Sequence, residues 1–493
     1  MNYIKRFTAL FVSVFFIFTL TACDSESKAY IYFSLSEQPA TVDPQTAQSD
    51  TELMLVRNIF EGLLRKNEDG KIVTGVCESF KKQNLTYTFY LRKDAVWSNE
   101  ESITAHDFVF ALRRAVDPET KAPFARRLLS IKNAKSILGG KKSVYDLGVK
   151  AINAQTLQIT LSYEDKDFEE TLTTSVAMPC NESFFKSAAG KYGLEKETTL
   201  SNGSYRLAKW GKDIFGIRLY RNDYYKGDFT AKNAAVFFSI DKERTPLEVL
   251  RDDDCDIAYI KPNEISTAKE LELNTASYNN ICWFLTVSDG FSKGIRTSLI
   301  SLANPQIFTK NLPDGYTAAE SVFPKALNTK TASTGMPVYD LENAKKEFAQ
   351  AVENLKDKKF PTDVVLYYYD DGVSKSVVTD IVGHWQNQLG AFVNIEAVSS
   401  PSVLIPQLKD QTYALSIFPV TANSAHIDEY LEKFGLSYKN QDTNTLQSKI
   451  LKSKNIVPLM TQDTTVAFSK NLNNLNFTHG SGSIDFAFVI KKD

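Results

Sequence analysis

Residues 364–397 carry a strand–helix–strand pattern, and this pattern constrains the fold more than any other feature of the chain. Residues 364–368 and 393–397 are predicted to be strands. Between them, residues 374–389 repeat apolar side chains at helical spacing, and Gly390 follows as a terminator. Strands joined in this way pair in parallel through a right-handed crossover. The pattern therefore predicts an α/β fold.

A further strand at residues 413–418 is expected to join the same sheet. In open parallel sheets, ligands bind beyond the carboxyl ends of the strands. The loop predicted at residues 419–425 is thus a natural binding position. Earlier in the chain, the pattern predicts a helix over residues 52–64, a strand at 87–91 and a helix that begins at the capping box Thr104–Asp107.

The amino terminus has the layout of a bacterial lipoprotein signal. Lys5 and Arg6 precede an apolar stretch from residue 7 to residue 20, and small residues lead to Cys23. This stretch suits a cleaved secretory signal better than a membrane span, which needs about 20 apolar residues. We predict that residues 1–22 are removed and that an acylated Cys23 anchors the chain to the bacterial cell membrane, outside the cytoplasm. The alternative is an uncleaved anchor with an incidental cysteine.

Charge and composition exclude several classes of protein. The formal net charge is -2, and removal of residues 1–22, which carry two basic residues and no acid, makes it -4. Nothing basic enough for nucleic acid remains. With 43% hydrophobic residues, the chain has ample material for large cores. We expect a monomer.

The sequence shows no sign of a catalytic or metal centre. Cys77, Cys180, Cys255 and Cys282 fit no zinc spacing, and although they allow three disulfide pairings, we expect free, buried thiols. No G-x-S-x-G, H-E-x-x-H or phosphate-binding loop occurs. We therefore predict no enzyme activity, no cofactor and no metal.

A set of motifs spread over essentially all of the mature chain closely resembles the oligopeptide-binding lipoproteins of ABC importers, the extracellular solute-binding proteins of family 5. The motifs are Val42-Asp43-Pro44, Phe60-Glu61-Gly62-Leu63-Leu64, the segment 87–99, Thr104-Ala105-His106-Asp107-Phe108, Arg114-Ala115-Val116-Asp117-Pro118, Asn202-Gly203-Ser204-Tyr205 and Val457-Pro458-Leu459. They occur in the family's order and at about its spacing.

The resemblance implies a two-lobed, periplasmic-binding-protein-like fold with an extra domain in the N-terminal lobe. It assigns residues 23–60, 185–278 and 463–493 to that lobe, residues 61–184 to the extra domain and residues 279–462 to the C-terminal lobe. The two lobes would close on an oligopeptide or peptide-like solute, held largely through its backbone, and deliver it to ABC permease subunits.

Carry-over of the family's site places ligand-binding residues at Gln48, Ser49 and Asp50 and an aromatic wall at Phe124. Gln48 stands where relatives have an acid, and Phe124 lacks the hydroxyl of their tyrosine. We expect Asp50 to supply the remaining negative charge.

In the loop after the strand at 413–418, the resemblance registers Val420, Thr421 and Asn423 with the family's Trp-x-Ala-Asp. Asn423 takes the place of the carboxylate that pairs with the ligand's amino group. Loss of that carboxylate costs a charge-assisted bond, about 2 to 5 kcal/mol. Recognition of a free peptide amine is therefore expected to be relaxed.

Other functions stay open at this point. The chain is a candidate for binding an amine-blocked peptide, a sugar or a metal chelate. It is also a candidate surface sensor or adhesin that kept the fold without transport. An extracytoplasmic hydrolase is disfavoured because no nucleophile with a neighbouring base occurs.

Overall fold

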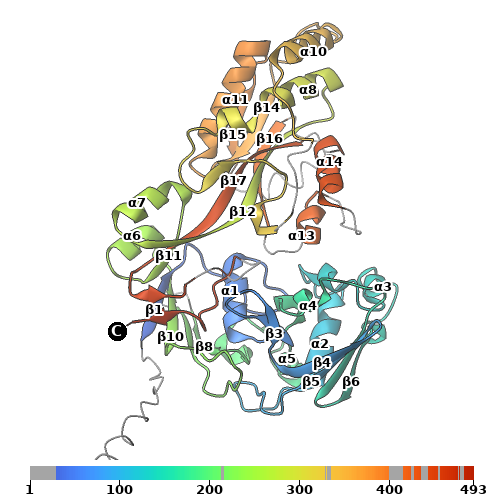
Figure 1. Ribbon diagram of the computed structural model, residues 1–493, viewed down its shortest axis with the longest axis vertical. Helices are drawn as coiled ribbons and strands as arrows, with labels where there is room; N and C mark the ends of the chain where they lie inside the picture. The colour runs from blue at the N-terminus through green and yellow to red at the C-terminus, as the bar shows by residue number, and fades with distance from the viewer. Residues whose placement is uncertain are drawn as a thin grey trace, which may run out of the picture.

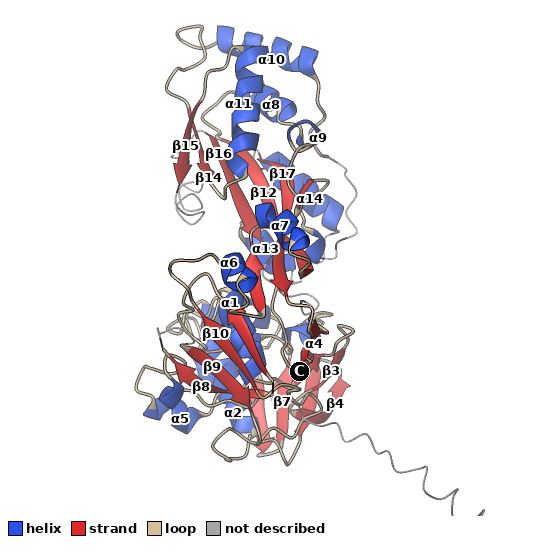
Figure 2. Ribbon diagram, turned by 90° about the vertical axis from the view of Figure 1, so that its left-hand side faces the viewer, coloured by secondary structure: helices blue, strands red, loops and turns tan. Residues whose placement is uncertain are grey.

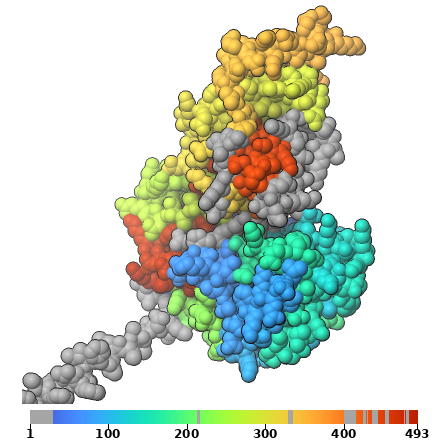
Figure 3. Space-filling model, turned by 45° about the vertical axis from the view of Figure 1, so that its right-hand side comes forward, coloured from blue at the N-terminus to red at the C-terminus, as the bar shows by residue number. Residues whose placement is uncertain are grey.

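The computed structural model describes residues 29–211, 216–327, 329, 335–398, 415–422, 427–434, 442–453, 456–475, 477 and 482–492. Two bodies lie one above the other, and two long strands, β12 (Asn274–Val287) and β17 (Ile456–Phe468), run between them (Figure 1). The narrower upper body, yellow to orange-red, sits on a broader lower body that is mainly blue and green (Figure 3).

The largest sheet of the described residues has 11 strands and passes through both bodies (Figure 2). Its path runs β15-β14-β16-β12-β17-β11-β1-β10-β9-β8, with β13 attached to β17. Besides β12 and β17, its strands are β1 (Tyr30–Ser34), β8 (Tyr205–Trp210), β9 (Ile217–Arg221), β10 (Ala235–Ser239), β11 (Ile257–Ile260), β13 (Tyr316–Ala318), β14 (Val365–Tyr369), β15 (Asn394–Val398) and β16 (Leu415–Thr421). The predicted domain boundaries at residues 278 and 463 fall inside β12 and β17, and the domain division stays a prediction.

The predicted strand–helix–strand unit is confirmed in the upper body. β14 pairs in parallel with both β15 and β16, and α11 (Ser374–Leu389) connects β14 to β15. Gly390 ends α11 in the left-handed region at φ 68°. Trp385 is fully buried in the body's core, and its Nε1 donates to the Leu299 carbonyl at 3.0 Å. The helices after β12 are α8 (Lys293–Leu302), α9 (Pro305–Phe308), α10 (Leu341–Glu353), α11, α13 (Ile427–Glu432) and α14 (Thr443–Ser453).

The prediction of a loop at residues 419–425 is wrong for residues 419–421, because β16 continues through Thr421. Residues 281–283 of β12 pair with residues 419–421, and this pairing extends the strand beyond Phe418. Pro419, the first residue of the predicted loop, lies inside the strand. Residues 423–425 lie outside the described residues.

The lower body also contains a four-stranded antiparallel sheet and several helices. The sheet order is β4 (Cys77–Gln83), β5 (Thr86–Leu91), β7 (Thr156–Thr160), β6 (Val149–Asn153), and the pair β2 (Leu64–Lys66) and β3 (Ile72–Thr74) lies before it in the chain. Its helices are α1 (Asp50–Ile59), α2 (Ala105–Val116), α3 (Ala134–Leu138), α4 (Phe168–Thr171) and α5 (Glu182–Ser187), and α6 (Pro246–Arg251) and α7 (Ile265–Glu270) precede β12. The capping box at α2 is confirmed, since the Thr104 amide donates to Asp107 Oδ2 at 2.7 Å. The short pair β18 (Leu472–Asn473) and β19 (Ile490–Lys491) ends the described chain.

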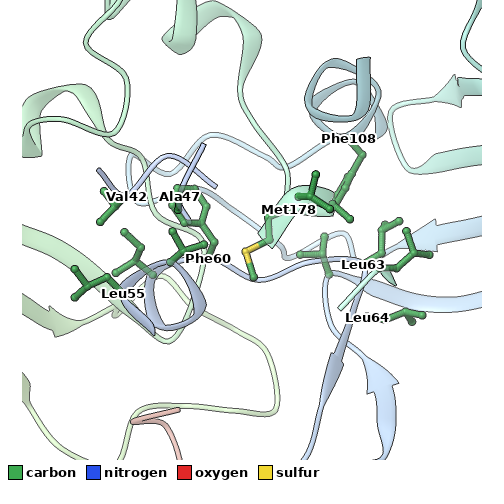
Figure 4. Close-up of a cluster of buried hydrophobic side chains, with 14 of the residues drawn as sticks. Val42, Ala47, Leu55, Phe60, Leu63, Leu64, Phe108 and Met178 are labelled. Carbon is green, nitrogen blue, oxygen red and sulfur yellow. The ribbon is translucent and has the colours of Figure 1, made fainter. Parts of the chain in front are cut away.

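One continuous hydrophobic core joins α1 to this second sheet. Phe60 and Met178 meet in its centre, with Val42 and Leu55 to one side and Leu63 to the other (Figure 4). Each Å² of apolar surface buried stabilises the folded state by about 25 cal/mol, so this core holds α1 in place.

Helix α1 ends at Ile59, whereas the predicted helix over residues 52–64 continues to Leu64. Phe60 turns extended, with φ -124° and ψ 153°. The cause lies far away in the chain: the Asn202 side chain accepts from the Glu61 amide at 3.1 Å and donates to the Glu61 carbonyl at 2.9 Å. These bonds hold Glu61 away from helical geometry.

The prediction of free, buried thiols is confirmed for Cys77, Cys180, Cys255 and Cys282. Burial raises the pKa of the Cys77 and Cys180 thiols to about 12, so they are protonated and unreactive at neutral pH. None of the helices described is both long and apolar enough to cross a membrane.

Candidate functional site

The segment before α1 is held by a capping network around Glu52. Ser49 is the N-cap, and its hydroxyl accepts from the Glu52 amide at 3.2 Å. In return, Glu52 Oε2 accepts from the amides of Gln48 at 2.9 Å and Ser49 at 3.1 Å, while Oε1 accepts from Ala40 at 2.9 Å. The predicted site residues Gln48 and Ser49 therefore have engaged backbone amides. The sequence Ser49-x-x-Glu52 also has the spacing of a capping box, a signal that the sequence analysis did not use.

Asp50 is the first residue of α1, a helix in the part of the lower body beneath β12 (Figure 1). A methyl group built on Gly482 would lie 3.6 Å from Asp50 Oδ2 and 3.7 Å from Asn280 Nδ2, so these two groups flank the same glycine. Burial raises the pKa of Asp50, and the charge of Lys433 in the upper body opposes that rise. Asp50 is thus a partly desolvated acid at the junction of the two bodies.

Two buried polar atoms beside Asp50 have no hydrogen-bond partner among the described residues. They are Tyr278 Oη and Asn280 Nδ2, both on β12. Burial raises the pKa of Tyr278, and the negative charge of Asp50 raises it further. An unsatisfied buried polar atom costs about 1 to 3 kcal/mol. These atoms are therefore ready to bond a ligand or a water molecule.

Asn280 lies at an irregularity in the backbone of β12. The register of β12 against β17 shifts between Asn279 and Ile281, which leaves Asn280 unpaired as a bulge. Its Oδ1 accepts from Thr464 Oγ1 at 2.8 Å, and its carbonyl accepts from the Ala422 amide at 2.7 Å. Bulges of this kind re-aim side chains near functional sites. Neither Tyr278 nor Asn280 was predicted as a site residue.

The upper-body residues of the predicted site lie next to this bulge. Thr421 pairs with Ile281, and its carbonyl accepts from Lys433 Nζ. Val420 is 4% exposed and packs in a hydrophobic cluster with Cys282 and Phe284. Asn423 lies outside the described residues.

Phe124 is partly buried and packs against the hydrophobic core of the lower body. It caps a short 3-10 helix, Ala125–Leu128, and the Arg127 guanidinium lies 4.8 Å from its ring centroid. Within the described ranges, no hydrogen bond, ion pair or ring contact joins Phe124 to Asp50 or Asn280. Its role as an aromatic wall stays a prediction.

Metal chemistry finds no support in the described part of the chain, where no three His, Cys, Asp or Glu residues are close enough to hold an ion. His384, for example, bonds Tyr339 Oη at 3.1 Å, and burial lowers its pKa. The group around Asp50 is suited to binding rather than to nucleophilic attack.

Comparison with known proteins identifies the family. The family model described as bacterial extracellular solute-binding proteins, family 5 Middle, matches residues 71–442. The chain belongs to this family of extracellular solute-binding proteins. The resemblance drawn from the motifs is thereby confirmed, and the chain is an extracytoplasmic solute-binding protein.

Individual relatives cover most of the chain. The oligopeptide-binding protein OppA of Bacillus subtilis is 25% identical over 442 residues, 83% of this chain and 81% of its own length. The periplasmic oligopeptide-binding protein OppA of Salmonella typhimurium is 28% identical over 388 residues, 72% of this chain and 68% of its own length.

Solved structures confirm the two-lobed fold. Listeria monocytogenes OppA bound to peptide has a TM-score of 0.75 at 21% identity and covers 95% of this chain and 100% of its own. Burkholderia pseudomallei OppA has a TM-score of 0.76 at 20% identity and covers 94% of this chain and 99% of its own.

Proposed function

We propose that this protein is the lipid-anchored, substrate-binding component of an ABC importer and that it captures peptide-like ligands between its two lobes. The observation that carries the proposal is the group formed by Asp50, Tyr278 and Asn280, where an acid, a phenol and an amide with unused bonding capacity meet beside the strands that join the lobes. The names of the relatives, oligopeptide-binding proteins, support the ligand class.

The anchor and the hinge complete this proposal. Acylation at Cys23 would hold the protein at the membrane, where two lipid signals give stable attachment. Strands β12 and β17 would act as the hinge, with residues 279–462 closing as one lobe on residues 23–60, 185–278 and 463–493, and with residues 61–184 as the extra domain.

The available hydrogen-bonding groups define the binding mode. The amides of Gln48 and Ser49 already donate to Glu52 and are not free for a ligand. Asn280 Nδ2 is a donor for a peptide carbonyl, and the Asp50 carboxylate is an acceptor for a peptide N–H. Main-chain groups are common to all peptides, so such contacts bind with little sequence preference.

The positive charge of Lys433 offsets part of the attraction between Asp50 and a free amino terminus. An ammonium that approaches Asp50 also meets the positive charge of Lys433, whereas a neutral, blocked terminus does not. With Asn423 in the place of the family's acid, we propose that the protein has relaxed its requirement for a free amine.

Calorimetry with matched peptides, free and N-acetylated, tests this proposal. We expect the two forms to bind with comparable affinity, and Lys433→Met to favour the free amine by up to about fivefold, the value of an exposed ion pair. Lys358→Met, far from the site on the upper body, is the control. A strong preference of the unmodified protein for free amines, with Asp50→Ala without effect, contradicts the proposal. Native mass spectrometry of the purified protein would identify a co-purified ligand.

A further inference from the structure

Residues 121–150 of the lower body are strongly basic. They contain eight Lys and Arg residues and one acid, Asp146, and so carry a net charge of +7. Because the predicted mature chain as a whole carries -4, the rest of it carries -11. Seven of the eight basic side chains are exposed, all except that of Arg127. The chain is therefore electrically polarised, and a surface of this kind attracts anions.

Most of this positive charge is not neutralised by neighbouring acids. Six lysines of the segment form no ion pair with any residue in the described ranges, namely Lys121, Lys132, Lys135, Lys141, Lys142 and Lys150. The acid of the segment, Asp146, is engaged in a turn, where its Oδ2 accepts from the Ser143 amide at 3.2 Å. By contrast, Lys82 on the neighbouring sheet lies 2.5 Å from Glu164. The segment thus keeps its charge available for a partner.

Short contacts gather these lysines where α3 meets the start of β6. The carbonyl of Lys132 accepts from the Gly148 amide at 2.9 Å, and a methyl group built on Gly148 would lie 2.7 Å from Lys132 Cβ. Gly148 directly precedes β6 and lies two positions before Lys150, so the two face the same side of the extended chain. Asn133, which directly precedes α3, accepts from Lys142 Nζ through Oδ1 at 2.8 Å. The resulting α3–β6 surface consists of Lys132, Lys135, Lys141, Lys142 and Lys150.

An exposed aromatic side chain belongs to the same region. Tyr145 is 75% exposed, and the Arg113 guanidinium lies 5.1 Å from the centroid of its ring, a cation–π contact. The carbonyl of the next residue, Asp146, accepts from Asn133 Nδ2 at 2.7 Å, which ties Tyr145 to the start of α3. A tyrosine has an apolar body and a polar tip, and such side chains favour the interface between membrane and water.

The character of the α3–β6 surface favours a membrane over a small ligand. All five of its lysines are exposed, and a lysine is a flexible point charge, unlike the planar fork of arginine that suits a single bound phosphate or carboxylate. Clusters of about four to eight basic residues held close to a membrane are attracted to anionic lipids. The predicted anchor, Cys23, is six positions before Ala29, and six extended residues span at most about 20 Å. The lower body is therefore close to the headgroups.

We propose that the α3–β6 surface docks on the anionic phospholipid headgroups of the membrane that carries the anchor. Figure 1 places β1, the first strand after the anchor, on the left-hand side of the lower body and α3 and β6 on its right-hand side. Attachment on two opposite sides fixes the orientation of the lower body, which a single tether leaves free. The choice of a membrane rests on the proposed anchor, whereas the attraction for anions rests on the lysines alone.

Co-sedimentation with vesicles tests the docking without any contribution from the acyl chains. The protein is the mature chain with Cys23→Ala, and the vesicles contain either equal parts of phosphatidylglycerol and phosphatidylcholine or phosphatidylcholine alone. We expect binding to the anionic vesicles at about 0.1 M salt and its loss at about 0.5 M, since salt screens exposed charges. Equal binding to both kinds of vesicle, or binding that does not respond to salt, overturns the proposal.

Substitution of the lysines tests whether this surface is the one that docks. A fourfold variant should bind the anionic vesicles at least about tenfold more weakly. It carries Lys132→Gln, Lys135→Gln, Lys141→Gln and Lys142→Gln. The matched control removes four exposed lysines of the upper body and should bind like the unmodified protein. It carries Lys345→Gln, Lys346→Gln, Lys356→Gln and Lys359→Gln. Equal weakening in the two variants would show an effect of net charge only, and it overturns the proposal.

A fluorescent label at position 145 identifies the face that meets the lipid. Cys77, Cys180, Cys255 and Cys282 are buried, so Tyr145→Cys in the Cys23→Ala protein offers one exposed thiol for labelling. An environment-sensitive dye at this position should brighten on the anionic vesicles, and the same dye on Lys356→Cys should not. No change at position 145 while the protein is bound overturns the proposal.

Polyglutamate separates a membrane from an acidic protein segment as the partner. At equal concentrations of negative charge, we expect it to displace little of the protein from the anionic vesicles. If polyglutamate binds more tightly than the vesicles do, the occupant is an acidic protein segment and the proposal is wrong. None of these measurements involves acylation or ligand binding, so a negative result leaves the proposed importer function as it stands.

Discussion

Replacement of Glu52 by Gln tests whether the capping network holds the binding segment before α1. Glu52 is 5% exposed, and its carboxylate accepts three backbone N–H groups, from Ala40, Gln48 and Ser49. Glutamine keeps one oxygen for two of these donors, but its NH₂ group then faces the third. Because this one carboxylate accepts all three amides, the substitution perturbs the segment that leads into Asp50.

The cost follows from the bonds that change. One charge-assisted hydrogen bond, worth about 1.5 to 3 kcal/mol, is lost, and two others fall to about half that strength when the charge is removed. We expect Glu52→Gln to lower the free energy of unfolding of the lower body by about 3 to 6 kcal/mol. Ligand affinity should fall as well, since Asp50 follows directly on the released segment.

Urea unfolding and hydrogen exchange measure these two effects. The amides of Ala40, Gln48 and Ser49 should lose protection in the variant, while those of β14 should not change. Glu342→Gln is the matched control, because Glu342 is an exposed acid in the first turn of α10, and its change should be below about 1 kcal/mol. A loss in Glu52→Gln no larger than in this control, with unchanged protection of the three amides, would refute the reasoning.

Four further outcomes are expected. Cys23→Ala should abolish acyl labelling and release the protein from membranes, and persistence of both would contradict the lipoprotein prediction. Small-angle scattering should show compaction on binding of a tight ligand, and an unchanged radius at saturation would exclude lobe closure. Asn423→Asp should raise the preference for a free peptide amine by roughly tenfold, measured by calorimetry. Because burial raises the pKa of Asp50 above its ordinary value of 3.8, the ionised carboxylate destabilises the folded, unliganded protein at pH 7. Asp50→Asn should therefore be more stable than the unmodified protein at pH 7, and this advantage should disappear as the pH falls toward 3.8; an advantage independent of pH would show that the carboxylate is well solvated.

Local patterns in the sequence predicted those parts of the fold that depend on local interactions. The unit of β14, α11 and β15 was found because helical and strand periodicities alternate over residues 364–397 and Gly390 supplies the terminator. The start of α2 was found because both members of its capping box lie within four residues.

Interactions between distant residues account for the wrong predictions. Helix α1 ends at Ile59 because Asn202, 141 residues from Glu61, bonds both backbone groups of Glu61. Strand β16 runs through Thr421 because it pairs with residues 281–283 of β12. No pattern within residues 52–64 or 413–425 contains this information, since propensity yields to tertiary pairing.

Of the three residues in the candidate group, the sequence analysis predicted Asp50 alone, and it did so through the family resemblance. Asp50 stands at the start of α1, and the motifs around it led to the prediction. Tyr278 and Asn280 come from a strand whose neighbours Cys282 and Phe284 are apolar and buried, and which therefore looked like core. The bulge in β12 leaves Asn280 out of the strand ladder, and this bulge is set by the register against β17, where Thr464, 184 residues away, bonds Asn280. The polar run Tyr278-Asn279-Asn280 before an apolar strand is the one signal in the sequence that marks this side of the candidate site. The run alone does not show that the Asp50 carboxylate lies near it in the folded protein.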